Sequence, residues 1–186
     1  MPKYLSTRAI VINKKRRGEG DLLTTLYTED MGKILCLAKG AQSIKSRRLG
    51  HLEIGSVIKV SLYQKDDFLW LSESESELSF LEHSEALIQI NLLFYFLEIA
   101  NALLPQNQAS PEIFGIIVQV IESISQNRLR SFIKNEILFL EKLGYGIPRD
   151  ILDNYNQADY KSTQKLIKAF CESIIEKKLT SSQLFT

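Results

Sequence analysis

The sequence predicts an α+β protein of two domains: an N-terminal five-stranded β-barrel of the oligonucleotide-binding (OB) type, followed by an all-helical domain. Two observations predict it. Short runs rich in Ile, Val, Leu, Thr and Tyr, separated by turn residues, fill the first 78 of the 186 residues. Near residue 80 the apolar period changes from about 2 to about 3.6 residues. We therefore expect an OB-fold domain over residues 1–78 and a helical domain over residues 79–186.

The five strands are expected over residues 6–13, 22–28, 33–38, 57–64 and 68–74. In the fourth run, Ile58, Val60 and Leu62 alternate with Lys59 and Ser61, which indicates a strand with one buried face. One longer connection, 41–55, joins the third run to the fourth. This arrangement favours an OB barrel, although SH3-like barrels have a similar number of strands.

The helices are expected over residues 85–104, about 111–125, 128–143 and 162–179, with a loop or short helix over 148–160. The first is apolar on almost every side, which is typical of a buried helix. Ser110 and Pro111 have the residue types that begin a helix, as N-cap and first helical position. Gly144 is expected to end the third helix.

The cysteines and the hydropathy indicate a compartment. Cys36 and Cys171 lie among apolar residues without a CxxC neighbour, so we expect buried thiols, no zinc site and a reducing environment. The longest apolar run, 92–97, is far shorter than the roughly 18 to 20 residues that span a bilayer. The N-terminus also lacks the apolar core of a signal peptide. We therefore expect a cytoplasmic protein with no membrane contact and no metal or other cofactor.

The net charge of +1 conceals a strong asymmetry along the chain. Residues 1–65 contain 13 basic and 5 acidic side chains, a net charge of +8. Residues 66–85 contain seven acidic and no Lys or Arg side chains, and residues 86–186 are balanced. This segregation predicts an anionic partner for the first third of the chain.

The run Lys14-Lys15-Arg16-Arg17 is the most informative motif, placed between two expected strands and just before Gly18. Four adjacent cations repel one another unless water or anions screen them. Phosphate groups neutralise such a run with release of counterions, and the two arginines can bind phosphate in a bidentate manner. We predict a phosphate-binding loop here, with a solvated loop as the alternative.

A second basic cluster follows the third strand and consists of Lys39, Lys45, Arg47 and Arg48. Two basic loops on one small barrel favour a nucleic-acid site to which both contribute, because the loop between the first two strands of an OB barrel lies near its binding face. Aromatic side chains that could stack on bases are Tyr4, Tyr27, Tyr63, Phe68 and Trp70. Burial in the core is the alternative for each of them.

Three carboxylates, Glu73, Glu75 and Glu77, lie on one side of a strand with period two and could bind Mg²⁺. Serines alternate with them and no His or Asp motif accompanies them, so a solvated strand end is favoured. A metal-dependent nuclease is the hypothesis that they leave open. No catalytic triad, dinucleotide fingerprint or P-loop can be assembled, so we expect a protein without enzymatic activity.

Five motifs follow one another in the first third: Arg8-Ala-Ile-Val-Ile-Asn13, Gly18-Glu-Gly-Asp-Leu-Leu23, Leu26-Tyr-Thr-Glu-Asp-Met-Gly-Lys-Ile34, Ala38-Lys-Gly-Ala41 and Ser46-Arg-Arg-Leu49. In order and spacing, this set resembles the RecO family of DNA repair and recombination mediator proteins over residues 5–65. The later part resembles it in being helical and in Leu143-Gly144-Tyr145. Many members carry a four-cysteine zinc motif soon after the Leu-Gly pair. Here the following residues contain no cysteine, so the chain resembles a short, zinc-free member.

The resemblance implies binding of single- and double-stranded DNA, strand annealing, and loading of RecA onto DNA coated by the single-strand-binding protein, in cooperation with RecR. The alternative function is a protein-interaction adaptor whose helical domain binds the tail of the single-strand-binding protein. In that case Arg128, Arg130 and Lys134 are the cations that could pair with an acidic tail. A solvated helix start is the other interpretation of these three residues.

Overall fold

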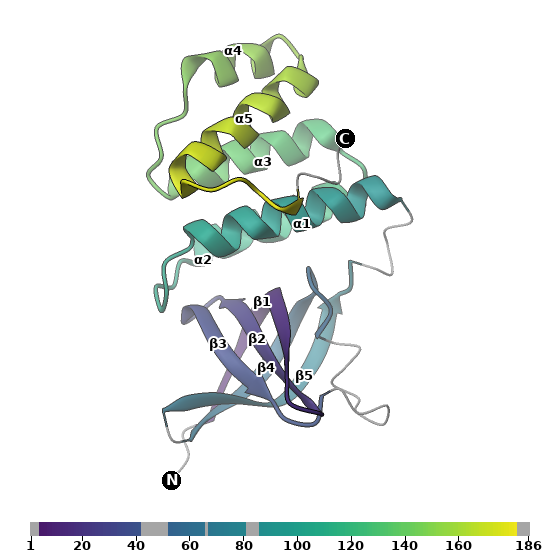
Figure 1. Cartoon of the computed structure of the whole chain (residues 1–186), viewed down its shortest axis with the longest axis vertical. Coiled ribbons are helices and arrows are strands. Elements are labelled where there is room, and N and C mark those ends of the chain that lie inside the picture. Colours follow the sequence, from purple (N-terminus) through teal and green to yellow (C-terminus); the bar gives the residue numbers. More distant parts are fainter. Residues whose placement is uncertain (1–3, 42–51, 66, 81–85, 182–186) are drawn as a thin grey trace. The chain divides into compact units, whose positions relative to one another are not determined.

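The computed structural model describes residues 4–41, 52–65, 67–80 and 86–181 (Figure 1). It contains a five-stranded closed barrel followed by five helices, which confirms the predicted fold class. Two compact units can be distinguished. The barrel unit comprises Met1–His83 and Pro105–Phe114, and the helical unit comprises Ser84–Leu104 and Gly115–Thr186. The domain boundary at residue 79 stays a prediction.

The strands of the barrel are β1 (Tyr4–Arg17), β2 (Asp21–Thr28), β3 (Gly32–Ala38), β4 (Val57–Lys65) and β5 (Phe68–Leu78). They close in the order β1-β2-β3-β5-β4 (Figure 1). Neighbouring strands are antiparallel except β3 and β5, which run parallel where Cys36 lies opposite Leu69. β1 is long enough to serve two neighbours, because its first half pairs with β4 and its second half with β2.

The interior of the barrel is filled by one apolar face of each strand. The inward side chains include Ile58, Val60 and Leu62 of β4, as their alternation predicts. Cys36 lies in the same core as a free thiol, and burial raises its pKa to about 12. This thiol is therefore a packing element rather than a nucleophile.

The end of the first strand differs from the expectation. The basic run 14–17 was expected in a loop, but it forms the last four residues of β1. These residues pair in register with Asp21–Thr24 of β2, so hydrogen bonding to a neighbouring strand outweighs the low strand preference of Lys and Arg. The phosphate-binding loop predicted here is in fact the end of a β-hairpin.

The helices are α1 (Leu87–Leu103), α2 (Pro111–Ser125), α3 (Leu129–Lys142), α4 (Arg149–Asn156) and α5 (Tyr160–Ile175). For residues 148–160, the sequence left open a loop or a short helix, and the structure has the short helix α4 there. The Ser110 hydroxyl accepts a hydrogen bond from the Ile113 N–H (3.3 Å), as an N-cap does. Gly144 follows α3 with φ +90°, a left-handed conformation that glycine adopts without steric cost. Among the described helices, none combines the length and apolarity needed to cross a bilayer.

The segment Pro105–Phe114, which follows α1 and includes the first four residues of α2, belongs to the barrel unit. Its Asn107 N–H donates to the Lys33 carbonyl (3.0 Å), and Gln106 forms a parallel bridge with Lys33. The ring of Phe114 stacks on Tyr27 with centroids 6.4 Å apart. Tyr27 is thereby buried, and it belongs to the packing of the barrel unit rather than to its surface.

The helical unit encloses both an aromatic core and a carboxyl group. Phe96 of α1 meets Phe139 of α3 edge to face, with centroids 5.2 Å apart. Glu136 of α3 is fully buried, and its Oε2 accepts a hydrogen bond from the Gln164 amide of α5 (3.3 Å). Desolvation raises the pKa of Glu136 to about 8, with hydrogen bonds from Tyr95 and Gln164 acting in the opposite direction.

Candidate nucleic-acid interface

The β1–β2 hairpin carries the basic run at its end. Lys14, Lys15, Arg16 and Arg17 lie opposite Thr24, Leu23, Leu22 and Asp21, and a turn over residues 18–20 joins the two strands. Gly18 takes φ +62° in this turn. Because directly opposed residues of an antiparallel pair project from the same face, the β2 partner of each cation tells which face the cation occupies.

A bulge divides the four cations between the two faces. The register of β1 against β2 shifts between Val11 and Asn13, which inserts Ile12 as an extra residue. Beyond it, Lys14 and Arg16 share a face with the core residue Leu22. Lys15 and Arg17 project from the outer face of the barrel. Without the extra residue the alternation would reverse, because a one-residue shift turns every side chain to the other face.

The four cations of the hairpin differ in the contacts that their side chains already make. Lys14 is half-buried, and its ammonium is paired with the Glu53 carboxylate at 2.9 Å. The Arg17 guanidinium lies over the ring of Phe68, 5.7 Å from its centroid. Within the described ranges, Lys15 and Arg16 are exposed and make no ion pair. These two side chains can therefore exchange water for a phosphate oxygen without first breaking an internal contact.

The second basic cluster begins beside this hairpin. Lys39 follows β3, and the N–H of the next residue, Gly40, donates to the Asp21 carboxylate (2.8 Å). Asp21 is itself the β2 partner of Arg17. The end of β3 is thus joined to the turn end of the β1–β2 hairpin, and Lys39 is exposed there. The other members of the cluster, Lys45, Arg47 and Arg48, lie outside the described residues.

Aromatic side chains extend along the outer face of β1, β4 and β5. The rings of Tyr4 and Tyr63 have centroids 5.9 Å apart, and those of Tyr63 and Trp70 are stacked at 6.3 Å. Phe68 lies two residues before Trp70 on β5 and therefore on the same face. Four of the five aromatic residues proposed from the sequence as stacking candidates are thus on one surface, while the fifth, Tyr27, is buried.

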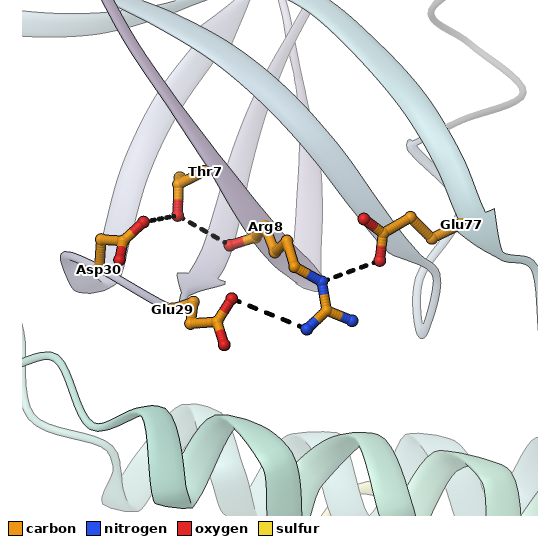
Figure 2. A network of polar contacts seen from close by, with 5 residues as sticks. All are labelled: Thr7, Arg8, Glu29, Asp30 and Glu77. Atoms are coloured by element: carbon orange, nitrogen blue, oxygen red, sulfur yellow. Dashed lines mark hydrogen bonds and ion pairs between the residues drawn. The ribbon is translucent and has the colours of Figure 1, made fainter.

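Glu77 of the acidic strand β5 pairs with Arg8 rather than with a cation of the basic run. The Arg8 Nε donates to Glu77 (2.9 Å), and an Arg8 terminal nitrogen lies 3.7 Å from Glu29 (Figure 2). Beside them the Thr7 hydroxyl donates to Asp30 (2.7 Å). The Arg8 guanidinium also lies over the ring of Phe114, 5.2 Å from its centroid. Arg8 is accordingly satisfied, and we do not count it among the phosphate-binding candidates.

A metal site at the β5 carboxylates receives no support. Glu73, Glu75 and Glu77 are exposed along the strand. Among the residues that the structure describes, no group of three His, Cys, Asp or Glu side chains is arranged to hold an ion. Exposed carboxylates at every second position are the arrangement of a solvated strand.

The three cations proposed on the helical part lie at the start of α3. Arg128 is the N-cap residue, and Arg130 and Lys134 are four residues apart and hence on the same side of the helix. All three are exposed. The pKa of Arg130 is raised above its ordinary value, first by a side-chain hydrogen bond with Tyr155.

Comparison with known proteins gives a consistent result. Residues 1–80 match the family model described as "Recombination protein O N terminal". The chain is 32% identical over 146 residues to "DNA repair protein RecO" of Dehalococcoides mccartyi, an alignment that covers 77% of this chain and 58% of that protein. It is 27% identical over 145 residues to "DNA repair protein RecO" of Syntrophobacter fumaroxidans, with the same coverage of 77% and 58%.

A third relative, "DNA repair protein RecO" of Coxiella burnetii, is 28% identical over 142 residues, which is 75% of this chain and 60% of the relative. The chain therefore spans less than two thirds of the length of the curated relatives it matches. The alignments reach beyond the barrel into the helical part, since each is longer than the 80 residues of the family model.

Proposed function

Because the chain belongs to the RecO family, we propose that it acts in DNA repair and recombination by binding the sugar–phosphate backbone of DNA through its barrel. The observation that carries the proposal is the β1–β2 hairpin, on which four successive cations end a strand and three, Lys15, Arg16 and Arg17, have no ion-pair partner within the described residues. Phosphate oxygens are the ligands that such side chains bind with release of counterions.

The proposed site consists of Lys14, Lys15, Arg16 and Arg17 on the hairpin, together with Lys39, Lys45, Arg47 and Arg48. Lys39 supports the inclusion of the second cluster, because the backbone beside it is hydrogen-bonded to Asp21 at the turn end of the hairpin. Lys14 contributes least, since a phosphate would compete with Glu53 for it. Contacts of this kind orient a nucleic acid without reading its sequence, so we expect little base specificity.

By family membership we further propose that the protein anneals strands and helps RecR to load RecA onto DNA coated by the single-strand-binding protein. These roles need no group of the chain to make or break a covalent bond, so we assign no catalytic residue and no cofactor. Binding both single and double strands through the backbone would support annealing, because the product duplex presents the same phosphates as its strands.

A second candidate function concerns the helical unit. Arg130 and Lys134 form an exposed pair of cations one turn apart on α3, with Arg128 at its start. A short acidic peptide such as the tail of the single-strand-binding protein could pair with them. A tail peptide that shifts no amide resonance of α3 at millimolar concentration would remove this candidate.

The DNA proposal is tested by charge reversal on the outer face of the hairpin. We expect Lys15→Glu with Arg17→Glu to weaken binding of a labelled 20-mer at least tenfold, because two phosphate contacts become repulsive. The matched control is Lys161→Glu with Lys165→Glu on α5, which changes the net charge equally. Equal affinities of the two variants would overturn the assignment, and circular dichroism would establish that both are folded.

A further inference from the structure

The outer face of the barrel presents a row of aromatic rings on three adjacent strands. Tyr4 of β1, Tyr63 of β4 and Trp70 of β5 follow one another with centroid separations of 5.9 and 6.3 Å. Trp70 lies opposite Leu37 of β3, and Phe68 is its same-face neighbour along β5. We call Tyr4, Tyr63, Trp70 and Phe68 the aromatic row.

The aromatic row is not part of the barrel core. Next to the row, the core side chains Leu62 of β4 and Leu71 of β5 point to the opposite face of the sheet. The side chains of Tyr4 and Phe68 are 67% and 49% exposed, whereas the core ring Tyr27 is 1% exposed. Single exposed apolar side chains are ordinary on a protein surface, but a contiguous row of large rings indicates a binding surface.

The aromatic row is continuous with the basic hairpin. The Arg17 guanidinium lies over the Phe68 ring at 5.7 Å, and Lys15 projects from the same face two residues before Arg17. A nucleic-acid backbone held at Lys15 and Arg17 would therefore bring its bases over Phe68 and Trp70. The exposed Leu35 of β3 extends the apolar part of this face.

We propose that the aromatic row is a stacking site for unpaired nucleobases and that it gives the barrel a preference for single-stranded over double-stranded DNA. The inference rests on the proposed function, since the basic hairpin must first hold the backbone. Every base has a π-face that can stack on an aromatic ring, so the site requires no particular sequence. In a duplex these faces are already covered by neighbouring base pairs, so only the phosphate contacts remain.

The inference can be tested on the unmodified protein, because Trp70 is the sole tryptophan of the chain. Its fluorescence is followed during titration with three 20-mer probes: oligothymidylate, a strand of abasic sites, and a blunt duplex. We expect quenching by oligothymidylate and at least fivefold less quenching at saturation by the other two. Equal quenching by all three would overturn the stacking site while leaving backbone binding intact.

A single substitution in the aromatic row measures how much base stacking contributes to the binding affinity. Phe68→Leu should weaken binding of oligothymidylate by about fivefold to a hundredfold, the loss measured for one base–aromatic stack. It should weaken binding of the duplex and the abasic strand far less, because these probes lose only the contact that the ring makes with Arg17. The control is Phe94→Leu, which removes a ring of similar exposure (40%) from α1. Melting temperatures of both variants exclude unfolding as the cause of any loss.

The outcomes separate the two proposals. A loss of affinity at least fivefold greater on oligothymidylate than on the other two probes supports the aromatic row as a base-stacking site. An equal loss on all three probes, or no loss on any, overturns the stacking site but leaves the basic hairpin as a backbone site. Failure of the unmodified protein to bind any of the probes at low salt would overturn both the stacking site and the proposed function.

Discussion

Glu136 shows how strongly the surroundings of a single residue can alter its chemistry. Its carboxyl group is enclosed by α1, α3 and α5, with Tyr95, Gln164 and Cys171 as polar or ionisable neighbours. Within the described residues its Oε1 and the Oε1 of Gln164 are buried without a hydrogen-bond partner. When protonated, the Glu136 carboxyl group can donate a hydrogen bond to a buried oxygen such as the Gln164 Oε1. This agrees with the pKa of Glu136 being raised to about 8.

The raised pKa makes a prediction about stability. Between pH 4.5 and about 8 the folded protein holds a proton on Glu136 that the unfolded chain releases. The free energy of unfolding should therefore fall as pH rises through this window, by up to about 1.4 kcal/mol per pH unit. Glu136→Gln cannot titrate, so we expect it to remove this dependence and to be more stable than the parent at pH 8.

Urea unfolding followed by helical circular dichroism at pH 5, 6, 7 and 8 measures this effect. Glu141→Gln, which changes an exposed glutamate of the same helix, serves as the control and should retain the pH dependence. An unfolding free energy that depends on pH equally in the parent and in Glu136→Gln would mean that Glu136 does not carry the proton.

At the scale of the secondary-structure elements, two local features shape the barrel unit. The bulge at Ile12 turns Lys15 and Arg17 outward, and the β2–β3 turn holds the segment Pro105–Phe114 against the barrel. The turn depends on Gly32, which has φ +72°. A Cβ atom at this position would lie 2.1 Å from the Gln108 carbonyl oxygen, so only glycine allows the two backbones to approach this closely.

Gly32→Ala should therefore destabilise the barrel unit by more than the conformational cost alone. The left-handed conformation costs a non-glycine residue about 1–2 kcal/mol, and the clash with Gln108 adds to it. Gly40→Ala is a matched control, because φ there is +64° and no atom lies within 4 Å of the added Cβ. Thermal unfolding of both variants gives the difference, and equal costs would show that the approach of Gln108 does not matter.

At the scale of the whole molecule, charge is segregated rather than abundant. The net charge is only +1, but residues 1–65 carry a net charge of +8. The acidic side chains of β5 do not pair with the hairpin within the described residues, since Glu77 binds Arg8 and the ion-pair partner of Lys14 is Glu53. The positive potential of the hairpin therefore remains available to an external anion.

This segregation predicts a measurable salt dependence. For a single strand that contacts about six phosphates, the logarithm of the binding constant should fall with the logarithm of salt concentration with a slope of about −4. Losing two contacts in Lys15→Glu with Arg17→Glu should reduce the magnitude of the slope by about 1.4. Titrations of labelled oligothymidylate at four salt concentrations measure both slopes. A slope near zero for the parent would contradict a backbone-binding mode.

The sequence by itself determined the kind of structure and predicted an anionic partner. Periods of apolar residues depend on local geometry alone, so the strands, four of the helices and the barrel-then-helices order could be predicted from them. The basic run 14–17 is equally a local property, and so is the residue type at Ser110 and Gly144. The predicted burial of Cys36 and Cys171 followed from their apolar neighbours in the sequence, and both thiols are buried.

Only the tertiary structure decided which of these residues share a surface. The bulge at Ile12 depends on pairing with β2, and because of it Lys15 and Arg17, of the four consecutive cations, project from the outer face of the barrel. Tyr4 and Trp70 belong to one row because β1, β4 and β5 are neighbours in a closed barrel, although the two residues are far apart in the sequence. Tyr27 is also an aromatic residue, but its ring is covered by Phe114. Register and closure are long-range properties of the sheet, so no local pattern of residues contains them.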